Sequence, residues 1–360
     1  MPATPTPDAR FAAVVYNPIK VDLGALKASV DAAAREAGWA ESRWYETSEE
    51  DPGVGGAKQA VEEGAEIVLA AGGDGTIRAV AEGLHTTGVP IALLPSGTGN
   101  LLARNLDLAL DNLDDSVRAA FTGVDRAVDL GIADLERPDG GRATHVFLVL
   151  AGLGLDAQML ANTDPALKKR VGWLAYVQGL AKSIRSGNTL RIRFKLDDEP
   201  SRSLRVNTIL IGNCGTLTGN VLLLPEAAID DGVFDIVALR PEGLVGWIQI
   251  GIKIFWENGV LRRSTVGRKI LRMTKEVRTL RYMKGRQIVI RPEVPQEFQL
   301  DGDPFGQIAA VRAVVDHRAL EVRIPATEAE RLPASEEAQE EQEHQDDGAA
   351  VREPVAETAA

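Results

Sequence analysis

The sequence predicts an α/β fold in two parts, an N-terminal doubly wound parallel sheet and a C-terminal domain built on an antiparallel sheet. Two observations lead to this expectation. Strands alternate with helices throughout residues 11–106, which is the order of a helix-covered parallel sheet. From about residue 127, short strand-like segments follow one another with few helical stretches between them, as in antiparallel sheets. We therefore expect one domain over residues 8–126 and another over 127–305.

The first domain alternates strands and helices in a regular order. The apolar run 11–16 predicts the first strand, and a helix over about 23–37 ends at Gly38. A second strand over 39–46 ends at Thr47. The next segments are a helix at about 55–63, a strand at 67–71, a helix at 77–84 and a strand at 91–95. Because a helical crossover joins the last two strands, they should be parallel and adjacent.

Each of these last two strands ends in a glycine-rich turn. The first turn is Gly72-Gly73-Asp74-Gly75-Thr76, and the second is Ser96-Gly97-Thr98-Gly99-Asn100. Both follow the carboxyl ends of parallel strands, where open α/β sheets bind ligands. Glycines let backbone N–H groups approach an anion, and a following helix adds positive partial charge. One such turn is common in α/β proteins, but two side by side indicate a polyphosphate site. A carboxylate repels phosphate, so Asp74 suggests a bridging Mg²⁺.

These turns closely resemble the diacylglycerol kinase catalytic family, which holds bacterial lipid kinases together with sphingosine and ceramide kinases. The Gly-Gly-Asp-Gly element also suits NAD kinases and phosphofructokinases, whereas the second turn, which leads into Ala103-Arg104-Asn105-Leu106, is similar to that of lipid kinases. The resemblance covers residues 11–325 and implies ATP as a substrate. It implies nucleotide contacts at Asn17, Pro18, Thr47, Gly72, Gly73, Asp74, Gly75, Thr76, Ser96, Gly97, Thr98 and Asn100. The family usually has Ser-Gly after Asn-Pro, where this chain has Ile19-Lys20-Val21, so Lys20 could supply charge there.

The second domain is predicted to consist mainly of short strands. They lie at about 128–133, 144–150, 190–196, 204–211, 234–239, 287–292 and 297–300, with helical stretches at about 165–186 and 243–257. The resemblance implies that this domain is a β-sandwich for the lipid substrate, and that residues 306–325 return to pack on the first domain. Residues 326–360 carry eleven Asp and Glu against two Arg and predict a disordered acidic tail.

An acidic turn, Asp301-Gly302-Asp303-Pro304, follows the predicted strand at 297–300. On local sequence alone this pattern is typical of an ordinary turn. The family has Asp-Gly-Glu here, and the resemblance implies that Asp303 is the general base for the lipid hydroxyl, with Asp301 as its supporting acid. Aspartate in place of glutamate shortens the side chain by one methylene. Phosphoryl transfer needs such a base only to accept the proton of the attacking hydroxyl.

Residues 222–232 resemble a structural Mg²⁺ loop of the same family. The resemblance implies Glu226 as the side-chain ligand, with backbone carbonyls from Leu223 and Ala228. Oxygen ligands from a tight loop suit a hard cation. An ordinary surface turn built from Pro, Asp and Gly is the alternative. The predicted metal ligands are therefore these three residues and Asp74.

Basic residues gather in two segments, 261–286 and 165–186, and the second also contains Trp and Tyr. Such segments suit an anionic membrane surface, so we expect the lipid substrate there and no nucleic acid partner; a homodimer is left open. Cys214 is the single cysteine, which excludes an intrachain disulfide and favours a reducing cytosol. With no apolar run of transmembrane length in the sequence, we expect a cytoplasmic protein that associates peripherally with the membrane.

Taken together, these features predict an ATP- and Mg²⁺-dependent lipid kinase that acts on diacylglycerol or a related long-chain lipid alcohol. Two alternatives stay open. The first is an NAD kinase-like enzyme, although the Ser-Gly-Thr-Gly-Asn turn argues against it. The second is a catalytically weak, membrane-binding regulatory homologue, which Asp303 and the altered loop after Pro18 could signal.

Overall fold

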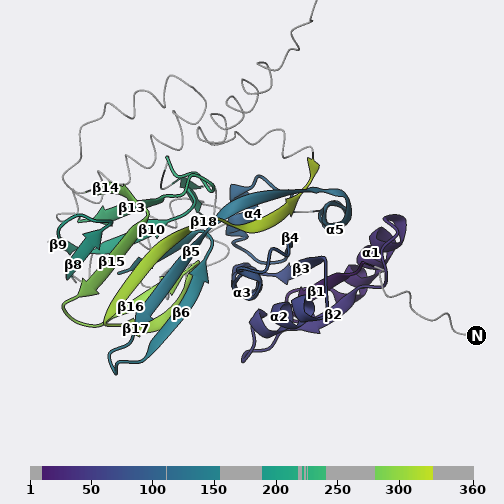
Figure 1. The fold of residues 1–360 in the computed structure, drawn as a ribbon, viewed down its shortest axis with the longest axis horizontal. Coiled ribbons are helices and arrows are strands. Elements are labelled where there is room, and N and C mark those ends of the chain that lie inside the picture. The colour runs from purple at the N-terminus through teal and green to yellow at the C-terminus, as the bar shows by residue number, and fades with distance from the viewer. Residues whose placement is uncertain are drawn as a thin grey trace, which may run out of the picture.

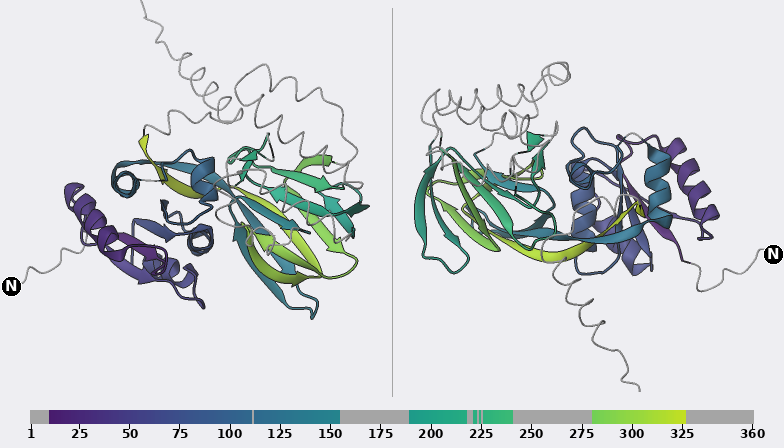
Figure 2. Two further views of the ribbon diagram at one scale, coloured as in Figure 1. Left: turned by 180° about the vertical axis from the view of Figure 1, so that it is seen from behind. Right: turned by 90° about the horizontal axis from the view of Figure 1, so that it is seen from above.

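The structure is a computed structural model, and it describes residues 10–110, 112–154, 189–217, 221, 222, 224, 226–240 and 280–326. These residues form an N-terminal unit with helices on both faces of a sheet and a C-terminal unit of packed strands (Figures 1 and 2). The predicted helices at 165–186 and 243–257 and the tail from residue 327 onward lie outside the described residues, as does most of the basic segment 261–286.

Parallel strands in the order β2-β1-β3-β4 form the sheet of the N-terminal unit. Its elements are β1 (Ala12–Tyr16), α1 (Leu23–Glu36), β2 (Arg43–Glu46), α2 (Val54–Glu62), β3 (Ile67–Gly72), α3 (Asp74–Leu84), β4 (Ile91–Pro95), α4 (Leu101–Asn105) and α5 (Leu113–Thr122). Helices α1 and α5 cover one face, and α2 and α3 cover the other. The doubly wound parallel sheet predicted from the sequence is thus confirmed.

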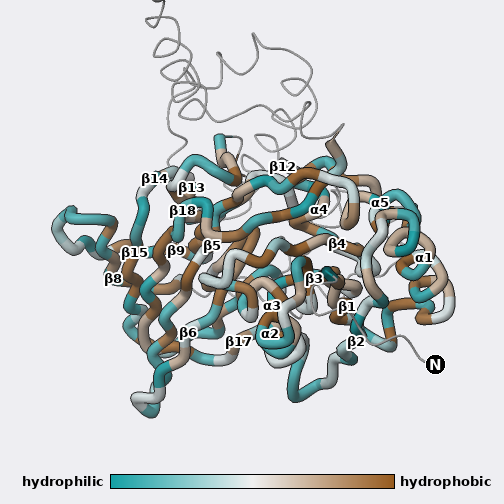
Figure 3. The backbone as a smooth tube through the Cα atoms, turned by 45° about the vertical axis from the view of Figure 1, so that its right-hand side comes forward, coloured by the Kyte–Doolittle hydropathy of each residue, from teal (hydrophilic) through white to brown (hydrophobic). Residues whose placement is uncertain are grey.

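Strands that are apolar on both faces explain this layered arrangement, because a sheet covered by helices on both sides buries every side chain. In β1, Ala13 and Val15 pack with α2 and α3, whereas Val14 and Tyr16 pack with α1 and α5. Hydrophobic stretches coincide with β1, β3 and β4 in the interior (Figure 3). The edge of the sheet at the carboxyl ends of its strands therefore adjoins a well-packed core.

The C-terminal unit is a sandwich of two mainly antiparallel sheets. Its strands are β5 (Val124–Glu136), β6 (Arg142–Phe147), β7 (Leu150–Leu153), β8 (Leu190–Leu196), β9 (Arg202–Val206), β10 (Thr208–Gly212), β11 (Thr216–Leu217), β12 (Val221–Leu222), β13 (Phe234–Leu239), β14 (Leu280–Gly285), β15 (Gln287–Pro292), β16 (Gln296–Leu300), β17 (Asp303–Ile308) and β18 (Ala310–Ile324). β11 and β12 form a separate two-stranded sheet, and one sheet of the sandwich has the order β14-β13-β10-β7-β16-β17. It packs on β5, β6, β8, β9, β15 and β18 through a core in which Phe147 stacks on Phe234.

Two long strands, β5 and β18, connect the units. They pair antiparallel along most of their length. The C-terminal end of β18 also pairs parallel with β4, and its N-terminal part pairs with β15. One hydrogen-bonded sheet therefore runs from the N-terminal unit into the sandwich. The domain boundary predicted between residues 126 and 127 falls inside β5.

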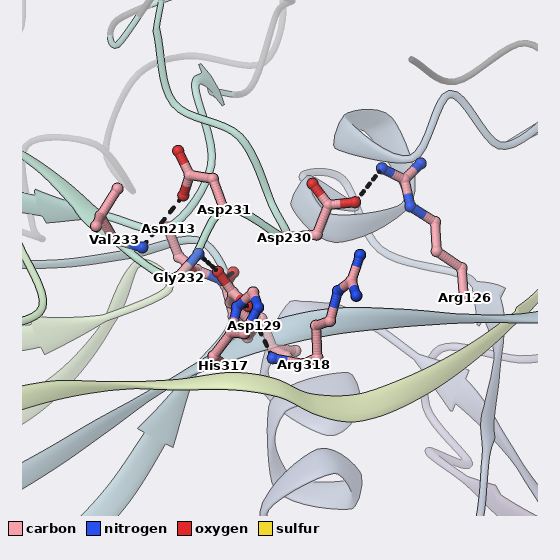
Figure 4. Close-up of polar contacts among 10 residues, drawn as sticks. Arg126, Asp129, Asn213, Asp230, Asp231, Gly232, Val233, His317 and Arg318 are labelled. Atoms are coloured by element: carbon pink, nitrogen blue, oxygen red, sulfur yellow. Dashed lines mark hydrogen bonds and ion pairs between the residues drawn. The ribbon is translucent and has the colours of Figure 1, made fainter. Parts of the chain in front are cut away.

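A buried carboxylate fixes the bend of β18 where it passes between the units. The register of β18 against β5 shifts after Asp316, and Arg318 has a left-handed φ of 53°. Asp129 of β5 is fully buried and accepts hydrogen bonds from His317 Nδ1 at 2.7 Å and from the Arg318 N–H at 2.8 Å. Its other oxygen accepts from the Gly232 N–H at 2.7 Å (Figure 4). Asp129 thus links three segments by hydrogen bonds: the bend of β18, strand β5 and the loop before β13.

Several predicted strands end differently in the structure. The strand expected at 204–211 is two strands, because the chain crosses from one sheet to the other at Asn207. The strand expected at 144–150 is interrupted after Phe147, because the N–H groups of the next three residues donate to Asp301 instead of to a neighbouring strand. Asp303 is the first residue of β17, so only the two residues before it form the turn.

No helix within the described parts of the chain is long and apolar enough to cross a membrane.

Candidate active site

The two glycine turns lie side by side because β3 and β4 are adjacent and parallel. Gly72 is in register with Pro95, and the Ser96 N–H donates to the Gly72 carbonyl at 2.8 Å. A Cβ atom on Gly97 would lie only 2.8 Å from the Gly73 Cα. Any larger residue at position 97 would therefore push the two turns apart.

The other predicted nucleotide residues of β1 and β2 lie on the same edge of the sheet. The Asn17 N–H donates to the Ala71 carbonyl at 2.9 Å, and the Thr47 N–H donates to the Tyr16 carbonyl at 2.9 Å. Pro18 follows Asn17, whose side-chain oxygen accepts from the Ile19 N–H. The strand ends are thus arranged as a common rim, with β3 and β4 at its centre.

Asp74 ties the first turn to the second. It is the first residue of α3, and its carboxylate accepts hydrogen bonds from the N–H groups of Asn100, at 2.9 Å, and Leu101. A Cβ atom on Gly99 would collide with the same carboxylate. Burial raises the pKa of Asp74, and the two N–H donors act against this rise. The sequence predicts Asp74 as a ligand of a bridging Mg²⁺, and the structure shows that it also holds the second turn in place.

Asn100 has a complementary role in the second turn. Its side chain is buried, its backbone has a left-handed φ of 48°, and its side-chain oxygen accepts from the Gly97 N–H at 3.0 Å. An asparagine tolerates this conformation better than most residues. Thr76 is also buried and packs against Gly72, where a Cβ atom would lie 2.7 Å from the Thr76 hydroxyl oxygen. Both residues therefore shape the turns from within.

Asp301 organises the acidic turn of the C-terminal unit. Its buried carboxylate accepts three backbone hydrogen bonds of 2.8–2.9 Å, from the N–H groups of Leu148, Val149 and Leu150. Burial raises the pKa of Asp301 to about 6, although the three donors act in the opposite direction. Its φ of 49° places the chain in a tight left-handed turn that leads into β17. Asp301 therefore fixes where β17 begins, with Asp303 at its first residue.

Asp303 brings the C-terminal unit into contact with the first glycine turn. A Cβ atom on Gly75 would lie 2.7 Å from Asp303 Oδ2, so the carboxylate lies directly over Gly75. Its side chain is 49% exposed. Burial raises the pKa of Asp303, whereas the positive charge of Arg78 lowers it. The negative charge of Asp303 in turn contributes to the raised pKa of Asp74.

Arg78 is a residue of this site that the sequence prediction missed. It follows Asp74 by one helical turn on α3, and it is buried. Its guanidinium lies 3.9 Å from Asp303 Oδ2, 3.7 Å from Glu82 Oε2 and 4.5 Å from the centre of the Phe305 ring. Its buried Nε has no hydrogen-bond partner in the described part of the chain. A buried cation beside both the glycine turn and the proposed base is suited to an anionic substrate.

Glu82 and His145 complete the surroundings of Arg78. Glu82 Oε2 accepts from the Val146 N–H at 3.2 Å and lies 3.4 Å from His145 Nδ1. The His145 ring packs on Phe305 at a centroid distance of 4.8 Å. The spacing of Arg78 and Glu82, four residues apart on a helix whose neighbouring positions are apolar, is the signal in the sequence that points to this buried pair.

The predicted structural Mg²⁺ loop lies beside the ammonium group of Lys284. Lys284 Nζ donates to the Glu226 carbonyl at 3.2 Å and lies 3.7 Å from the Glu226 carboxylate and 3.2 Å from Asp235. The Lys284 ammonium offsets part of the negative charge that Glu226 would offer a divalent ion. The Mg²⁺ site in this loop stays a prediction. Leu223 lies outside the described residues, and Ala228 is half-buried in the loop. In the described parts of the chain, no three His, Cys, Asp or Glu side chains form a metal-binding cluster.

Comparisons with known proteins match the two units separately. The diacylglycerol kinase catalytic domain matches residues 12–133, and the YegS C-terminal NAD kinase beta sandwich-like domain matches residues 149–251. A "Probable lipid kinase YegS-like" of Pseudomonas putida is 33% identical over 274 residues, which cover 74% of this chain and 80% of that protein. The diacylglycerol kinase of Bacillus subtilis is 23% identical over 299 residues, which cover 81% of this chain and 90% of that protein.

Other relatives and a solved structure extend this comparison. The chain spans 52% of the length of the uncharacterized protein sll0036 of Synechocystis, with 23% identity over 245 residues. The crystal structure of a diacylglycerol kinase from Bacillus anthracis has a TM-score of 0.62 at 20% identity and covers 90% of this chain and 99% of that chain. This likeness shows a common fold. The chain belongs to the diacylglycerol kinase catalytic family, in the group that carries a YegS-type β-sandwich-like domain.

Proposed function

We propose that the chain is a lipid kinase that transfers the γ-phosphoryl group of ATP to a lipid hydroxyl, with diacylglycerol or a related long-chain lipid alcohol as the acceptor. The contact between Asp303 and Gly75 carries this proposal. Through this contact, the carboxylate of Asp303 in the C-terminal unit lies directly over the first glycine turn of the N-terminal unit. A hydroxyl between the two units would therefore meet a base and a phosphoryl donor at one point.

The glycine turns are suited to the nucleotide phosphates. The first N–H groups of α3 have no partner within the helix and carry the positive end of its dipole. Gly73 and Gly97 let the two turns pack directly against each other because neither has a side chain. Arg78 adds a full positive charge one helical turn further on. Donors preorganised in this way stabilise the charge that spreads over the γ-phosphoryl oxygens in the transition state.

Asp303 is the proposed proton acceptor. The lipid oxygen attacks the γ-phosphorus, its proton passes to an Asp303 carboxylate oxygen, and the bond between the γ-phosphorus and the β,γ-bridging oxygen breaks to release ADP. A raised pKa brings the carboxyl closer to neutral pH, where a general base is most effective. Asp301 holds the turn that aims Asp303 and has no role in the proton transfer itself.

Mg²⁺ that arrives with ATP would be held by the remaining carboxylate lone pairs of Asp74. Mg²⁺ is commonly bound by one or two carboxylates together with substrate phosphates, without a complete protein cage. Asp74 still has free lone pairs after it accepts two N–H donors. The ion would supply positive charge at the γ-phosphoryl oxygens.

Phosphorylation of a lipid panel tests the proposal. The full chain is incubated with ATP and Mg²⁺ in mixed micelles that contain diacylglycerol, a sphingoid base or another long-chain alcohol, with NAD as a separate acceptor. We expect phosphate transfer to one of the lipids and none to NAD. Transfer to NAD would favour the NAD kinase-like alternative. ATP binding without transfer to any acceptor would favour a membrane-binding regulatory homologue.

A further inference from the structure

Arginines gather on the outer face of the sandwich, on β8, β9 and β15. An open groove of about 470 Å³ lies there, and its charged lining includes Arg191, Arg193, Arg205 and Arg291. The side chains of β8 alternate between buried and exposed, with both of its arginines exposed. The groove is therefore on the solvent side of the sheet, away from the core between the two sheets.

The strand register places these arginines directly opposite one another. Arg191 of β8 faces Arg205 of β9, and Arg193 of β8 faces Arg291 of β15. Side chains that face each other across antiparallel strands have Cβ atoms about 5 Å apart, and like charges at this distance destabilise a sheet. Two adjacent pairs of facing arginines therefore lower the stability of the sheet when no anion is bound between them.

Few acids offset this charge. Glu293 lies 3.9 Å from Arg191, and Glu136 lies 3.7 Å from Arg291, and these arginines are more than half exposed. Such surface pairs contribute little. Among the described residues, no ion pair is formed by Arg193 or Arg205. An external anion is the group that would neutralise them.

We infer that this arginine groove binds the phosphomonoester headgroups of membrane lipids. A phosphomonoester carries a charge of about −1.5 to −2 at neutral pH, so a single headgroup can neutralise one facing pair. The planar guanidinium group of an arginine can donate two parallel hydrogen bonds to phosphate oxygens.

Val294, at the rim beside the lining residue Glu293, is a large apolar residue that is 65% exposed. Basic and exposed apolar groups together suit a bilayer surface. Single-stranded nucleic acid is disfavoured because no aromatic ring for base stacking is found among the described lining residues.

The groove is separate from the candidate active site. Val294 lies just before the N-terminal end of β16, and Asp301 and Asp303 lie just after its C-terminal end. The five residues of β16 therefore separate the groove from these two acids. Binding at the groove thus requires neither ATP nor an acceptor. The inference goes beyond the proposed kinase activity, because it predicts a second contact with phosphorylated lipid that holds whichever acceptor is used.

Vesicle binding by the full chain tests the inference. The probe variant is Arg193→Gln with Arg205→Gln, which takes one arginine from each facing pair. The matched control is Arg118→Gln with Arg202→Gln, which removes the same charge from exposed arginines paired with Asp115 and Glu199. Binding is measured by flotation with phosphatidate vesicles and with phosphatidylglycerol vesicles adjusted to equal surface charge. Each groove arginine should contribute about fivefold, the factor that corresponds to about 1 kcal/mol.

We expect the probe variant to bind phosphatidate vesicles about 25-fold more weakly than the control, with a smaller loss for phosphatidylglycerol. Its melting temperature should equal or exceed that of the wild type, because repulsion is relieved. Equal vesicle binding by both variants, or a clearly lower melting temperature of the probe variant, would overturn the inference. So would soluble glycerol phosphate or an oligonucleotide that binds the groove more tightly than vesicles do.

Discussion

At the scale of single residues, the proposed chemistry depends most on Asp303, whose side chain is one methylene shorter than the glutamate usual in the family. Asp303→Asn removes the proton acceptor but leaves the glycine turns intact, so we expect most turnover to be lost while ATP affinity is retained. Steady-state rates at saturating ATP and lipid, together with calorimetric ATP titration, measure this. Asp303→Glu should keep substantial activity. An Asp303→Asn enzyme as fast as the wild type would show that Asp303 is not the base.

Arg78 should set the pH dependence of that base. Asp303 accepts a proton only when it is ionised, so kcat/KM should rise with pH through its pKa. Arg78 lowers this pKa by its positive charge. In Arg78→Met the pKa should rise further, and the acidic limb of the kcat/KM profile should move to higher pH, whereas Arg78→Lys should move it less. A limb that stays in place in Arg78→Met would show that Arg78 does not act through Asp303.

The nucleotide residues could be predicted from the sequence because their motifs are local. Gly72 to Thr76 and Ser96 to Asn100 are contiguous turns whose chemistry can be read without tertiary information. The spacing of Arg78 and Glu82 is local, but the contacts of Arg78 with Asp303 and Phe305 could not be predicted, because these two residues come from a strand more than two hundred residues later. Glu226 is a second example: a local resemblance predicts it as a metal ligand, but its contact with the distant Lys284 could not be seen in the sequence.

At the scale of elements, Asp74 couples α3 to the second glycine turn, and this coupling can be measured. Asp74→Ala should slow turnover by roughly 10², about 2–3 kcal/mol of transition-state stabilisation. It should also lower the free energy of unfolding by about 1 kcal/mol, because the N–H groups of Asn100 and Leu101 lose their acceptor. Near-wild-type turnover would exclude the role of Asp74 in the phosphate site.

A second substitution isolates the contact between the turns. Gly99→Ala places a methyl group against the Asp74 carboxylate and should destabilise the wild type by about 1–3 kcal/mol. In an Asp74→Ala background the methyl group has room, so the same change should cost much less. Urea unfolding of the four proteins gives the coupling energy, which should be about 0.5–3 kcal/mol. Additive effects would mean that the two turns are positioned independently.

Strand boundaries were predicted less well than strand positions, and the reasons are physical. The break between β6 and β7 arises because Asp301 takes the N–H groups of residues 148–150, a contact that no local pattern reveals. The crossing at Asn207 lies within a run of strand-forming residues, so the change of sheet is invisible in the sequence. In contrast, the alternation of strands and helices over residues 11–106 predicted the parallel sheet correctly, because burial on both faces demands apolar strands.

At the scale of the whole molecule, the pairing of β5 with β18 makes the two units parts of one sheet. The active-site geometry needs this connection, because Asp303 belongs to one unit and Gly75 to the other. The sequence alone gave no register for this pairing, since its partners are almost two hundred residues apart. Asp129 fixes the bend of β18 by accepting hydrogen bonds from His317, Arg318 and Gly232.

Asp129→Asn should therefore weaken the connection between the units. Its amide NH₂ would face either the Gly232 N–H or the His317 and Arg318 donors, which leaves buried donors without an acceptor and should cost about 2–3 kcal/mol. Native-state hydrogen exchange can follow β3 and β8 separately. In the wild type, the slowest amides of both strands should exchange with the same free energy, as one cooperative unit. In Asp129→Asn the two values should separate, while Glu297→Gln, a change of an exposed carboxylate on β16, should leave them equal. Equal values in Asp129→Asn would show that backbone pairing of β5 with β18 suffices to couple the two units.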